Sequence, residues 1–217
     1  MIAYYGGAFD PIHNGHLFAA RVAQDIFGLD EVRFVLTARP VHKDPCSRDL
    51  ASRWEMLKLA LHNQNHMVAD DIEISDLNRQ SYTYDTLIKL RKKHGATKPL
   101  FWLMGSDQFA VLESWYRGLE LVSLAHILVF SRPAAPQGSK RTRQMQKFID
   151  LHLGKKVHEF TSSPSGKLYF VAQPMLDISS TRIREDLKTG TGVQDLLPAS
   201  VLSYIMEKHL YPTGDNE

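Results

Sequence analysis

Short apolar runs alternate along this chain with segments in which apolar residues recur every three or four positions. The runs predict strands, and paired isoleucines that alternate with acids predict one more; the ranges are 2–5, 32–36, 72–74, 100–104, 127–130 and 168–172. The periodic segments predict helices at 17–27, 50–61, 84–94, 109–112, 119–124 and 142–153, and two more that begin near 178 and 198. Regular alternation of strands and helices predicts an α/β fold: a Rossmann-like, doubly wound parallel sheet with helices on both faces and a C-terminal helical portion.

The length and composition narrow the class of protein. At 217 residues the chain suits one domain, expected over 1–212, with a polar tail at 213–217. A formal charge of +2 gives no reason to expect nucleic-acid binding. The chain lacks a secretory signal pattern at its start and an apolar run near the roughly 20 residues of a membrane span. With a single cysteine, Cys46, these features predict a cytoplasmic protein with no membrane partner, and a homo-oligomer is left open.

The first strand leads into a glycine pair, two histidines and a helix, in the stretch Gly6-Gly7-Ala8-Phe9-Asp10-Pro11-Ile12-His13-Asn14-Gly15-His16. Glycines after a buried strand allow positive φ angles and close approach of a ligand. A helix N-terminus favours anions, and histidines three positions apart can lean over the same spot. We therefore predict a phosphate site here. A structural histidine pair remains the alternative, and zinc is not favoured because no third ligand is obvious.

A second cluster of donors begins the helix near residue 178. Ser180 and Thr181 offer hydroxyls, and further cations for a phosphate are Lys43, Arg182 and Arg184. An ordinary helix cap and a solvated arginine are the alternatives. Neither G-x-x-x-x-G-K-[ST] nor G-x-G-x-x-G occurs, so the commonest phosphate-binding motifs are excluded. Because ligands bind at the carboxyl ends of parallel strands, we expect the turns at 6–16, 105–107 and 178–184 to converge.

These segments resemble the two signatures of the nucleotidyltransferase superfamily. The first is the glycine–histidine stretch, and the second is Ile178-Ser179-Ser180-Thr181-Arg182-Ile183-Arg184. Further segments narrow the resemblance to the bacterial nicotinate-nucleotide adenylyltransferases: Ser81-Tyr82-Thr83, Gly105-Ser106-Asp107, Trp115-Tyr116, Arg132-Pro133 and Asp195-Leu196-Leu197-Pro198. The resemblance covers residues 2–212 and is weakest over 134–166. It implies adenylyl transfer from ATP to nicotinate mononucleotide, with pyrophosphate and deamido-NAD as products and Mg²⁺ held by the phosphates.

The resemblance also implies a role for individual residues. The catalytic set is His13, His16, Lys43 and Arg184, with His16 nearest the α-phosphate. The ATP-binding set is Gly6, Gly7, Ala8, Phe9, His13, His16, Gly105, Asp107, Ser180, Thr181 and Arg184. The set for nicotinate mononucleotide is Gly7, Ala8, Lys43, Thr83, Asp107, Trp115 and Tyr116. In it Trp115 stacks on the pyridine ring, while Thr83 and the backbone of Tyr116 receive the carboxylate.

Two features depart from the family pattern. The loop reads Pro40-Val41-His42-Lys43 where the family has Pro-Pro-His-Lys, which keeps the lysine. Residues 140–156 hold six Lys or Arg and one acid, and we interpret them as a solvated helix or a subunit contact. Two other functions stay open: a pantetheine-phosphate adenylyltransferase, which shares the first signature, and a regulator that binds nucleotides without catalysis.

Overall fold

The computed structural model describes residues 1–39, 48–75, 80–131, 141–172 and 176–211. Within them, six strands form one sheet: β1 (Ile2–Gly7), β2 (Glu31–Leu36), β3 (Met67–Asp70), β4 (Leu100–Gly105), β5 (His126–Phe130) and β6 (Leu168–Val171). The helices are α1 (Asn14–Phe27), α2 (Leu50–Leu61), α3 (Thr83–His94), α4 (Ser106–Ala110), α5 (Arg143–His152), α6 (His158–Thr161), α7 (Ser180–Thr189) and α8 (Ala199–Glu207). Two 3₁₀ helices, η1 (Leu112–Ser114) and η2 (Gly118–Ser123), separate α4 from β5.

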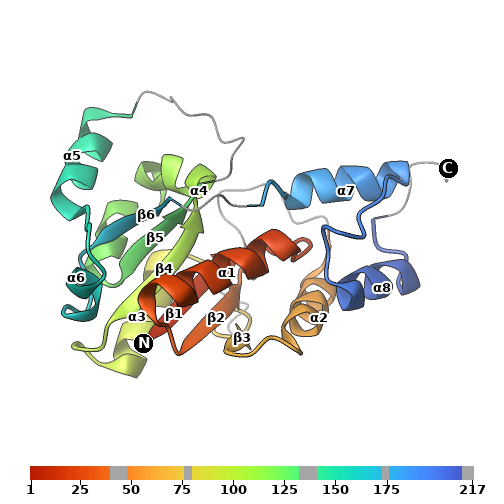
Figure 1. Ribbon diagram of the computed structural model, residues 1–217, viewed down its shortest axis with the longest axis horizontal. Coiled ribbons are helices and arrows are strands. Elements are labelled where there is room, and N and C mark those ends of the chain that lie inside the picture. Colours follow the sequence, from red (N-terminus) through yellow and green to blue (C-terminus); the bar gives the residue numbers. More distant parts are fainter. Residues whose placement is uncertain (40–47, 76–79, 132–140, 173–175, 212–217) are drawn as a thin grey trace.

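The sheet is parallel, with strand order β3-β2-β1-β4-β5-β6. The chain builds outward from β1 in one direction through β2 and β3, then returns to the other side of β1 with β4 (Figure 1). The switch point therefore lies between β1 and β4, where doubly wound sheets bind their ligands. The predicted fold class is confirmed.

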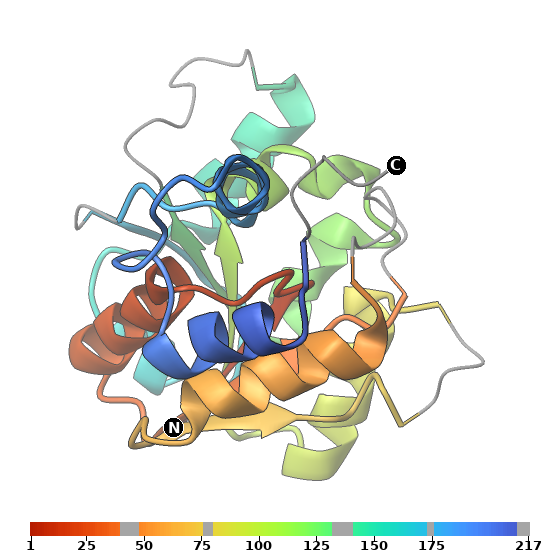
Figure 2. The same cartoon turned by 90° about the vertical axis from the view of Figure 1, so that its right-hand side faces the viewer.

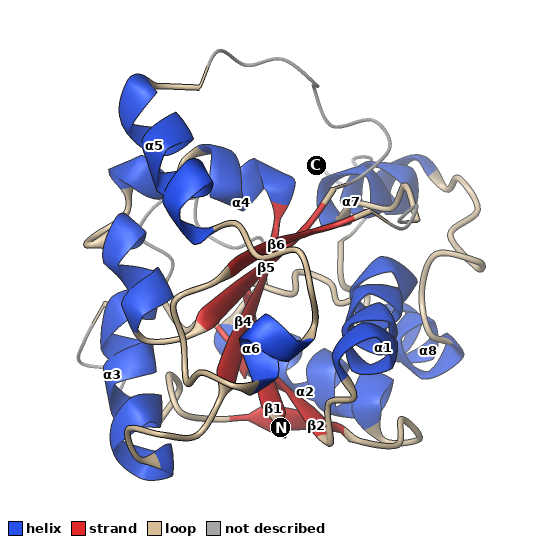
Figure 3. Ribbon diagram, turned by 60° about the vertical axis from the view of Figure 1, so that its left-hand side comes forward, coloured by secondary structure: helices blue, strands red, loops and turns tan. Residues whose placement is uncertain are grey.

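Helices cover both faces of the sheet, with α3, α4 and α5 on one side and α1, α2 and α8 on the other (Figure 3). Side chains of the central strands alternate between two buried cores. In β4, Phe101 and Leu103 face the α1 side, whereas Leu100, Trp102 and Met104 face the α3 side. This alternation explains why these strands read as continuous apolar runs in the sequence.

Local capping chemistry sets several helix ends where the sequence predicts them. Asp49 accepts a hydrogen bond from the N–H of Ser52 and so caps α2. Gly28 ends α1 in the left-handed conformation, with φ of +61° and ψ of +45°. Thr142 caps α5 through the N–H of Met145. These contacts are decided within three or four residues, which is why sequence alone finds them.

Some elements differ from the sequence-based expectation. The strand expected at 72–74 is a turn, and the neighbouring strand is β3, at Met67–Asp70. The short helix α6 was not predicted. The helix expected at 119–124 is the 3₁₀ helix η2, which begins at Gly118. This position excludes a side chain, because a Cβ there would lie 1.9 Å from the carbonyl oxygen of Leu112.

The C-terminal helices extend the α1 side of the fold. Helix α8 lies along α2 (Figure 2), and the hydroxyl of Ser200 donates to the carbonyl of Leu59 at 3.0 Å. Helix α7 reaches the loop that follows β1 through two hydrogen bonds described below. Among the described helices, none is long and apolar enough to cross a membrane. The single-domain boundary at 212 and the tail at 213–217 fall outside the described residues and stay predictions.

Candidate active site

The two histidines of the first signature stack on each other at the start of α1. His13 is the N-cap residue and His16 lies three residues on, with ring centroids 3.6 Å apart and planes inclined by 21°. His13 is almost completely buried, at 2% exposure. Gly15 makes room for this arrangement, since a Cβ there would lie 3.0 Å from Nδ1 of His13. The expected position of both rings at the helix N-terminus is therefore confirmed.

A hydrogen bond indicates which nitrogen of His16 can donate to a ligand. The backbone N–H of His13 donates to Nδ1 of His16 at 3.3 Å. Nδ1 is then an acceptor, and in the neutral imidazole the proton sits on Nε2. The rings of Phe9 and Tyr5 pack edge-on against His16, with centroids 5.0 and 5.8 Å away. His16 is thus held as a donor of fixed orientation, as stabilisation of a phosphate oxygen requires.

The glycine pair allows close packing of aromatic rings, and the prediction that these glycines adopt positive φ angles is wrong. Gly6 and Gly7 do not have positive φ angles; Phe9 does, at +45°. A Cβ on Gly6 would lie 2.3 Å from the ring of Trp102, and one on Gly7 would lie 2.8 Å from the ring of Phe9. Both positions exclude a side chain because aromatic rings occupy that space.

Side chains from distant parts of the chain hold the backbone carbonyls of this loop. The buried Arg53 of α2 donates from Nη1 to the carbonyls of Ala8 and Thr37, both at 2.9 Å. The hydroxyl of Ser180 donates to the carbonyl of Pro11 at 2.9 Å. Arg184 donates from Nη1 to the carbonyl of Asp10, also at 2.9 Å. The loop is therefore fixed by α2 and α7 before any ligand arrives.

The last described residue also reaches this loop. Tyr211 is buried, and its hydroxyl donates to Oδ1 of Asp10 at 2.5 Å. Burial raises the pKa of Tyr211, and the neighbouring Asp10 raises it further, so the phenol stays protonated and remains a donor. Asn14 donates from its backbone N–H to the carbonyl of Leu196 at 2.9 Å. The C-terminal part of the chain thus contacts both ends of the loop that carries His13.

The hydroxyls at the start of α7 divide between two roles. Ser179 is the helix cap and accepts from the N–H of Arg182, so the capping alternative is right for that residue. Ser180 instead crosses to the loop after β1. Thr181 accepts a long hydrogen bond, 3.4 Å, from Nη2 of Arg184. Ser180 and Arg184 therefore contact the loop that carries His13, and Thr181 contacts Arg184, while their phosphate contacts stay predictions.

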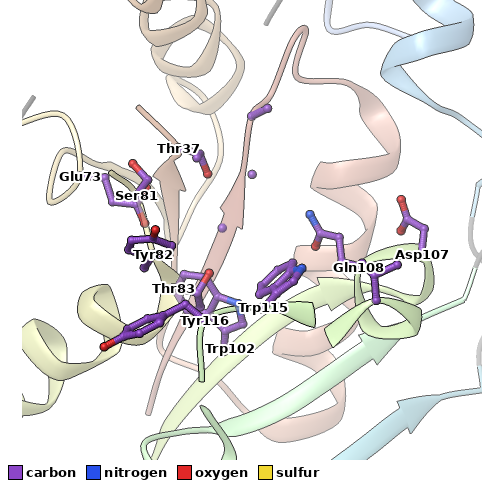
Figure 4. Close-up of a pocket in the computed structure, with 14 residues that line it drawn as sticks. Thr37, Glu73, Ser81, Tyr82, Thr83, Trp102, Asp107, Gln108, Trp115 and Tyr116 are labelled. Carbon is purple, nitrogen blue, oxygen red and sulfur yellow. The ribbon is translucent and has the colours of Figure 1, made fainter. Parts of the chain in front are cut away.

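The segment between β1 and α1, residues 8–13, carries His13 and is called the histidine loop here. A pocket opens next to it, at the carboxyl ends of β1 and β4 (Figure 4). Seven of the predicted site residues line it: Gly6, Gly7, Ala8, Thr83, Asp107, Trp115 and Tyr116. The other lining residues are Thr37, Glu73, Ser81, Tyr82, Trp102, Gln108 and Val111. Gly6 and Gly7 end β1 and Ala8 begins the loop after it, and all three line the pocket, so the two regions form one continuous site.

Aromatic side chains form the wall of the pocket around Trp115. Tyr116 is half exposed, and its ring packs against those of Tyr82 and Tyr84 with centroids 4.9 and 6.0 Å away. Arg117 lies over the ring of Tyr84 at 4.0 Å and so supports the same group. These contacts direct the Tyr116 side chain toward Tyr82 and Tyr84.

The N-terminus of α3 supplies the polar end of this wall. Thr83 is the first residue of the helix, where backbone N–H groups lack partners within the helix and the dipole is positive. An anionic group fits there. Glu73 lines the pocket as well, and Oε1 of its carboxyl accepts from the hydroxyl of Thr86 at 2.7 Å. Burial raises the pKa of Glu73, which favours the neutral acid beside an anionic ligand.

Asp107 lies in the first turn of α4, directly after β4. Gly105 was expected to let a nucleotide come close. In the structure its missing side chain makes room for Asp107, because a Cβ there would lie 2.5 Å from Oδ1. The absence of a side chain at Gly105 thus leaves room for the Asp107 carboxyl, and close approach of a nucleotide stays a prediction.

The structure brings together all the predicted site residues that it describes, and it adds others. Lys43 and the Arg132-Pro133 segment lie outside the described residues. Sequence reasoning missed Arg53, Glu73 and Tyr211, together with the carbonyls of Asp195 and Leu196 that hold Asn14. For Arg53 the sequence held a signal, since this arginine is at helical spacing from Met56, Leu57 and Ala60 on the apolar face of α2.

Comparison with known proteins gives a consistent result. Residues 4–186 match the family described as Cytidylyltransferase-like. A Klebsiella pneumoniae protein named "Probable nicotinate-nucleotide adenylyltransferase" is 34% identical over 209 residues, covering 96% of each chain. A Hahella chejuensis protein with the same name is 36% identical over 214 residues, covering 97% of this chain and 95% of that one.

A solved structure shares the fold. It is the Plasmodium falciparum nicotinic acid mononucleotide adenylyltransferase complexed with NaAD, with a TM-score of 0.73 at 21% identity, covering 97% of this chain and 96% of that one. This similarity supports the fold, and the sequence relatives carry the family assignment. The chain belongs to the cytidylyltransferase-like nucleotidyltransferases and, within them, to the nicotinate-nucleotide adenylyltransferase family.

Proposed function

We propose that this chain transfers the adenylyl group of ATP to nicotinate mononucleotide, forming deamido-NAD and pyrophosphate. The observation that carries the proposal is the continuity of the site. A loop with two stacked histidines joins, through Gly7 and Ala8, a pocket lined by an aromatic ring and a helix N-terminus. The names of the sequence relatives support the same reaction.

The reaction is a direct displacement at phosphorus. An oxygen of the acceptor's 5′-phosphate attacks the α-phosphorus of ATP and forms the new P–O bond. The bond from that phosphorus to the oxygen that bridges to the β-phosphate breaks, and its electron pair leaves with pyrophosphate. Such chemistry depends on positioning and charge stabilisation more than on a protein nucleophile. The site offers both through fixed donors.

Each residue has a part in this scheme. His16 donates from Nε2 to an oxygen of the α-phosphate, where charge builds up during transfer. His13 at the end of the loop, Arg184 bound to its Asp10 carbonyl, and Thr181 beside Arg184 serve the remaining phosphates. We assign Lys43 to them as well. Mg²⁺ enters with ATP, held by phosphate oxygens.

The acceptor occupies the pocket. Its pyridine ring stacks on Trp115, and its carboxylate meets Thr83 and the backbone N–H of Tyr116 at the positive end of α3. Asp107 accepts from ribose hydroxyls between the two nucleotides. A carboxamide in place of the carboxylate would lose the charge that this end of the helix favours, so the acid is the preferred acceptor.

Pyrophosphate release tests the proposal. The purified chain is supplied with ATP and Mg²⁺ and with nicotinate mononucleotide, nicotinamide mononucleotide or phosphopantetheine. We expect release with the first, less with the second and none with the third. Absence of release with nicotinate mononucleotide would refute the proposed reaction, and equal rates with the first two would refute the carboxylate assignment. Release with phosphopantetheine alone would favour the pantetheine-phosphate reaction.

A further inference from the structure

Arg48 lies next to the site and has no role in the account above. It is outside the sequence-predicted set, immediately before the cap of α2. Its guanidinium carbon lies over the ring of Tyr211, 5.0 Å from the ring centroid. Its Nε is shielded from solvent and has no hydrogen-bond partner in the part of the chain that the structure describes. A buried donor without a partner is costly, so a ligand that accepts from it would be favoured.

Tyr211 connects this guanidinium to the histidine loop. The hydroxyl on the same ring donates to Oδ1 of Asp10, and Arg184 donates to the carbonyl of Asp10. Arg48 and Arg184 are both near enough to lower the pKa of Tyr211, although burial and Asp10 outweigh them. Two guanidinium groups therefore flank the Asp10–Tyr211 pair, three residues before His13.

The backbone of Arg48 is also fixed. Nε of Arg53 donates to the carbonyl of Arg48 at 3.3 Å, and the same arginine holds the carbonyl of Ala8 in the loop. One buried side chain thus sets the distance between Arg48 and the glycine–histidine loop. A cation placed this way is positioned before binding, which increases what it can contribute to affinity.

The two guanidinium groups near the Asp10–Tyr211 pair favour binding of an anionic ligand in addition to the Asp10 carboxyl. Arg48 and Arg184 both lie near the phenol of Tyr211, and the hydroxyl of that phenol donates to the carboxyl of Asp10. Guanidinium groups bind phosphate oxygens through paired N–H donors and stack well on aromatic rings. A phosphate chain that passes the histidines toward α7 would meet Arg184 and Arg48 together.

We propose that Arg48 is a further binding residue for the β- and γ-phosphates of ATP, and for pyrophosphate as it leaves. The proposal rests on the proposed function, because it places the triphosphate along the histidine loop. The ring of Tyr211 holds the guanidinium in place, and the phosphate chain satisfies its buried donor.

The test compares Arg48→Gln with Arg143→Gln, which removes an equal charge from an exposed position on α5. We expect Arg48→Gln to raise KM for ATP at least about tenfold, the loss typical of one hydrogen bond to a charged group. The inhibition constant of pyrophosphate should rise by a similar factor. KM for the acceptor should stay within about twofold, and Arg143→Gln should behave like the unmodified chain. An unchanged KM for ATP would overturn the proposal.

A binding measurement separates this inference from the proposed reaction. Calorimetric titration with inorganic tripolyphosphate, without an acceptor, needs no catalysis. Weaker binding by Arg48→Gln than by Arg143→Gln supports the proposal even if pyrophosphate release fails with every acceptor. Equal binding, with a lower melting temperature for Arg48→Gln, would show that Arg48 only balances the charge of Asp10. Arg48→Met keeps an apolar stem on Tyr211. If Arg48→Gln does not fold, the same binding comparison is made with Arg48→Met.

Discussion

The two halves of the site are built differently. At the phosphate half, Arg53, Ser180 and Arg184 hold three loop carbonyls at 2.9 Å, and Tyr211 holds Asp10. At the acceptor half, the wall includes side chains such as Val111 that remain half exposed. In the phosphate half, protein side chains already satisfy the polar groups of the loop. The acceptor half leaves apolar surface for a ligand to cover.

This difference matches what each half must do. Charge develops at phosphorus during the transfer, and donors fixed beforehand stabilise it without reorganisation. The acceptor must enter and the dinucleotide must leave, so a partly open aromatic pocket suits that half. Substitutions at the loop should therefore lower kcat, while substitutions in the pocket should raise KM for the acceptor.

The largest expected effect is that of His16→Ala. Removing one fixed donor to a transition-state oxygen typically costs roughly 2.7–4 kcal/mol, or about 10²–10³ in kcat. KM for the acceptor should change little. Steady-state pyrophosphate release measures both constants, with His62→Ala, an exposed position after α2, as the control. Near-normal turnover of a folded His16→Ala variant would remove His16 from the chemistry.

Tyr211→Phe should lower both stability and kcat, because Tyr211 acts on the phosphate half through Asp10. It deletes one buried hydrogen bond to a carboxylate, an interaction worth about 1.5–3 kcal/mol. We expect the free energy of unfolding in urea to fall by about that amount and kcat to fall several-fold, with KM for the acceptor unchanged. Tyr204→Phe is the matched control, because the Tyr204 hydroxyl makes no hydrogen bond to a described residue. Identical behaviour of the two variants would argue against positioning through Asp10.

Trp115→Ala tests the acceptor half. Aromatic stacking adds about 0.5–1.5 kcal/mol to simple burial, so KM for the mononucleotide should rise by roughly threefold to tenfold. KM for ATP, measured on the same variant, serves as the internal control and should stay nearly constant. A change confined to ATP would place the adenine, and not the pyridine ring, against Trp115.

The smallest effect concerns the pH dependence of stability through Glu73. Burial raises the pKa of Glu73 in the folded chain above its ordinary value. Between those two values the folded state holds the proton longer than the unfolded state, so stability decreases as pH rises, by about 1.4 kcal/mol per pH unit of that window. Glu73→Gln has no proton to lose. Its melting temperature should therefore rise relative to the unmodified chain as pH increases through the window.

A control completes that measurement. Glu207→Gln removes an exposed carboxyl from α8, and its melting temperature should follow the unmodified chain at every pH. Parallel curves for Glu73→Gln and the unmodified chain would mean that the Glu73 carboxyl is ionised in the folded protein.

The sequence predicts those parts of the fold that local chemistry decides. Continuous apolar runs locate β1, β2, β4, β5 and β6, and the caps at Asp49 and Gly28 mark helix ends. The alternation of Ile72 and Ile74 with acids was misleading, because Glu73 lines the ligand pocket within a turn. A polar residue that lines a pocket between two apolar residues can thus produce the alternation from which a strand is predicted.

For the site, too, the sequence predicts the local motifs but not the distant residues that hold them. Its motifs lie next to one another in sequence, and the rule for parallel sheets brings their ends together. The residues that hold those motifs were missed. Tyr211 reaches Asp10 across 201 positions, and Arg53 reaches Ala8 across 45. Hydrogen bonds between residues this far apart along the chain leave no local pattern in the sequence.

A crystal structure with deamido-NAD would test the two-part site most directly, because that product spans both halves. In that structure we expect the pyridine ring against Trp115 and its carboxylate at Thr83 and the backbone of Tyr116. We expect the phosphates beside His16. A pyridine ring bound away from Trp115, or phosphates beyond hydrogen-bond distance of His16, would contradict the two-part site.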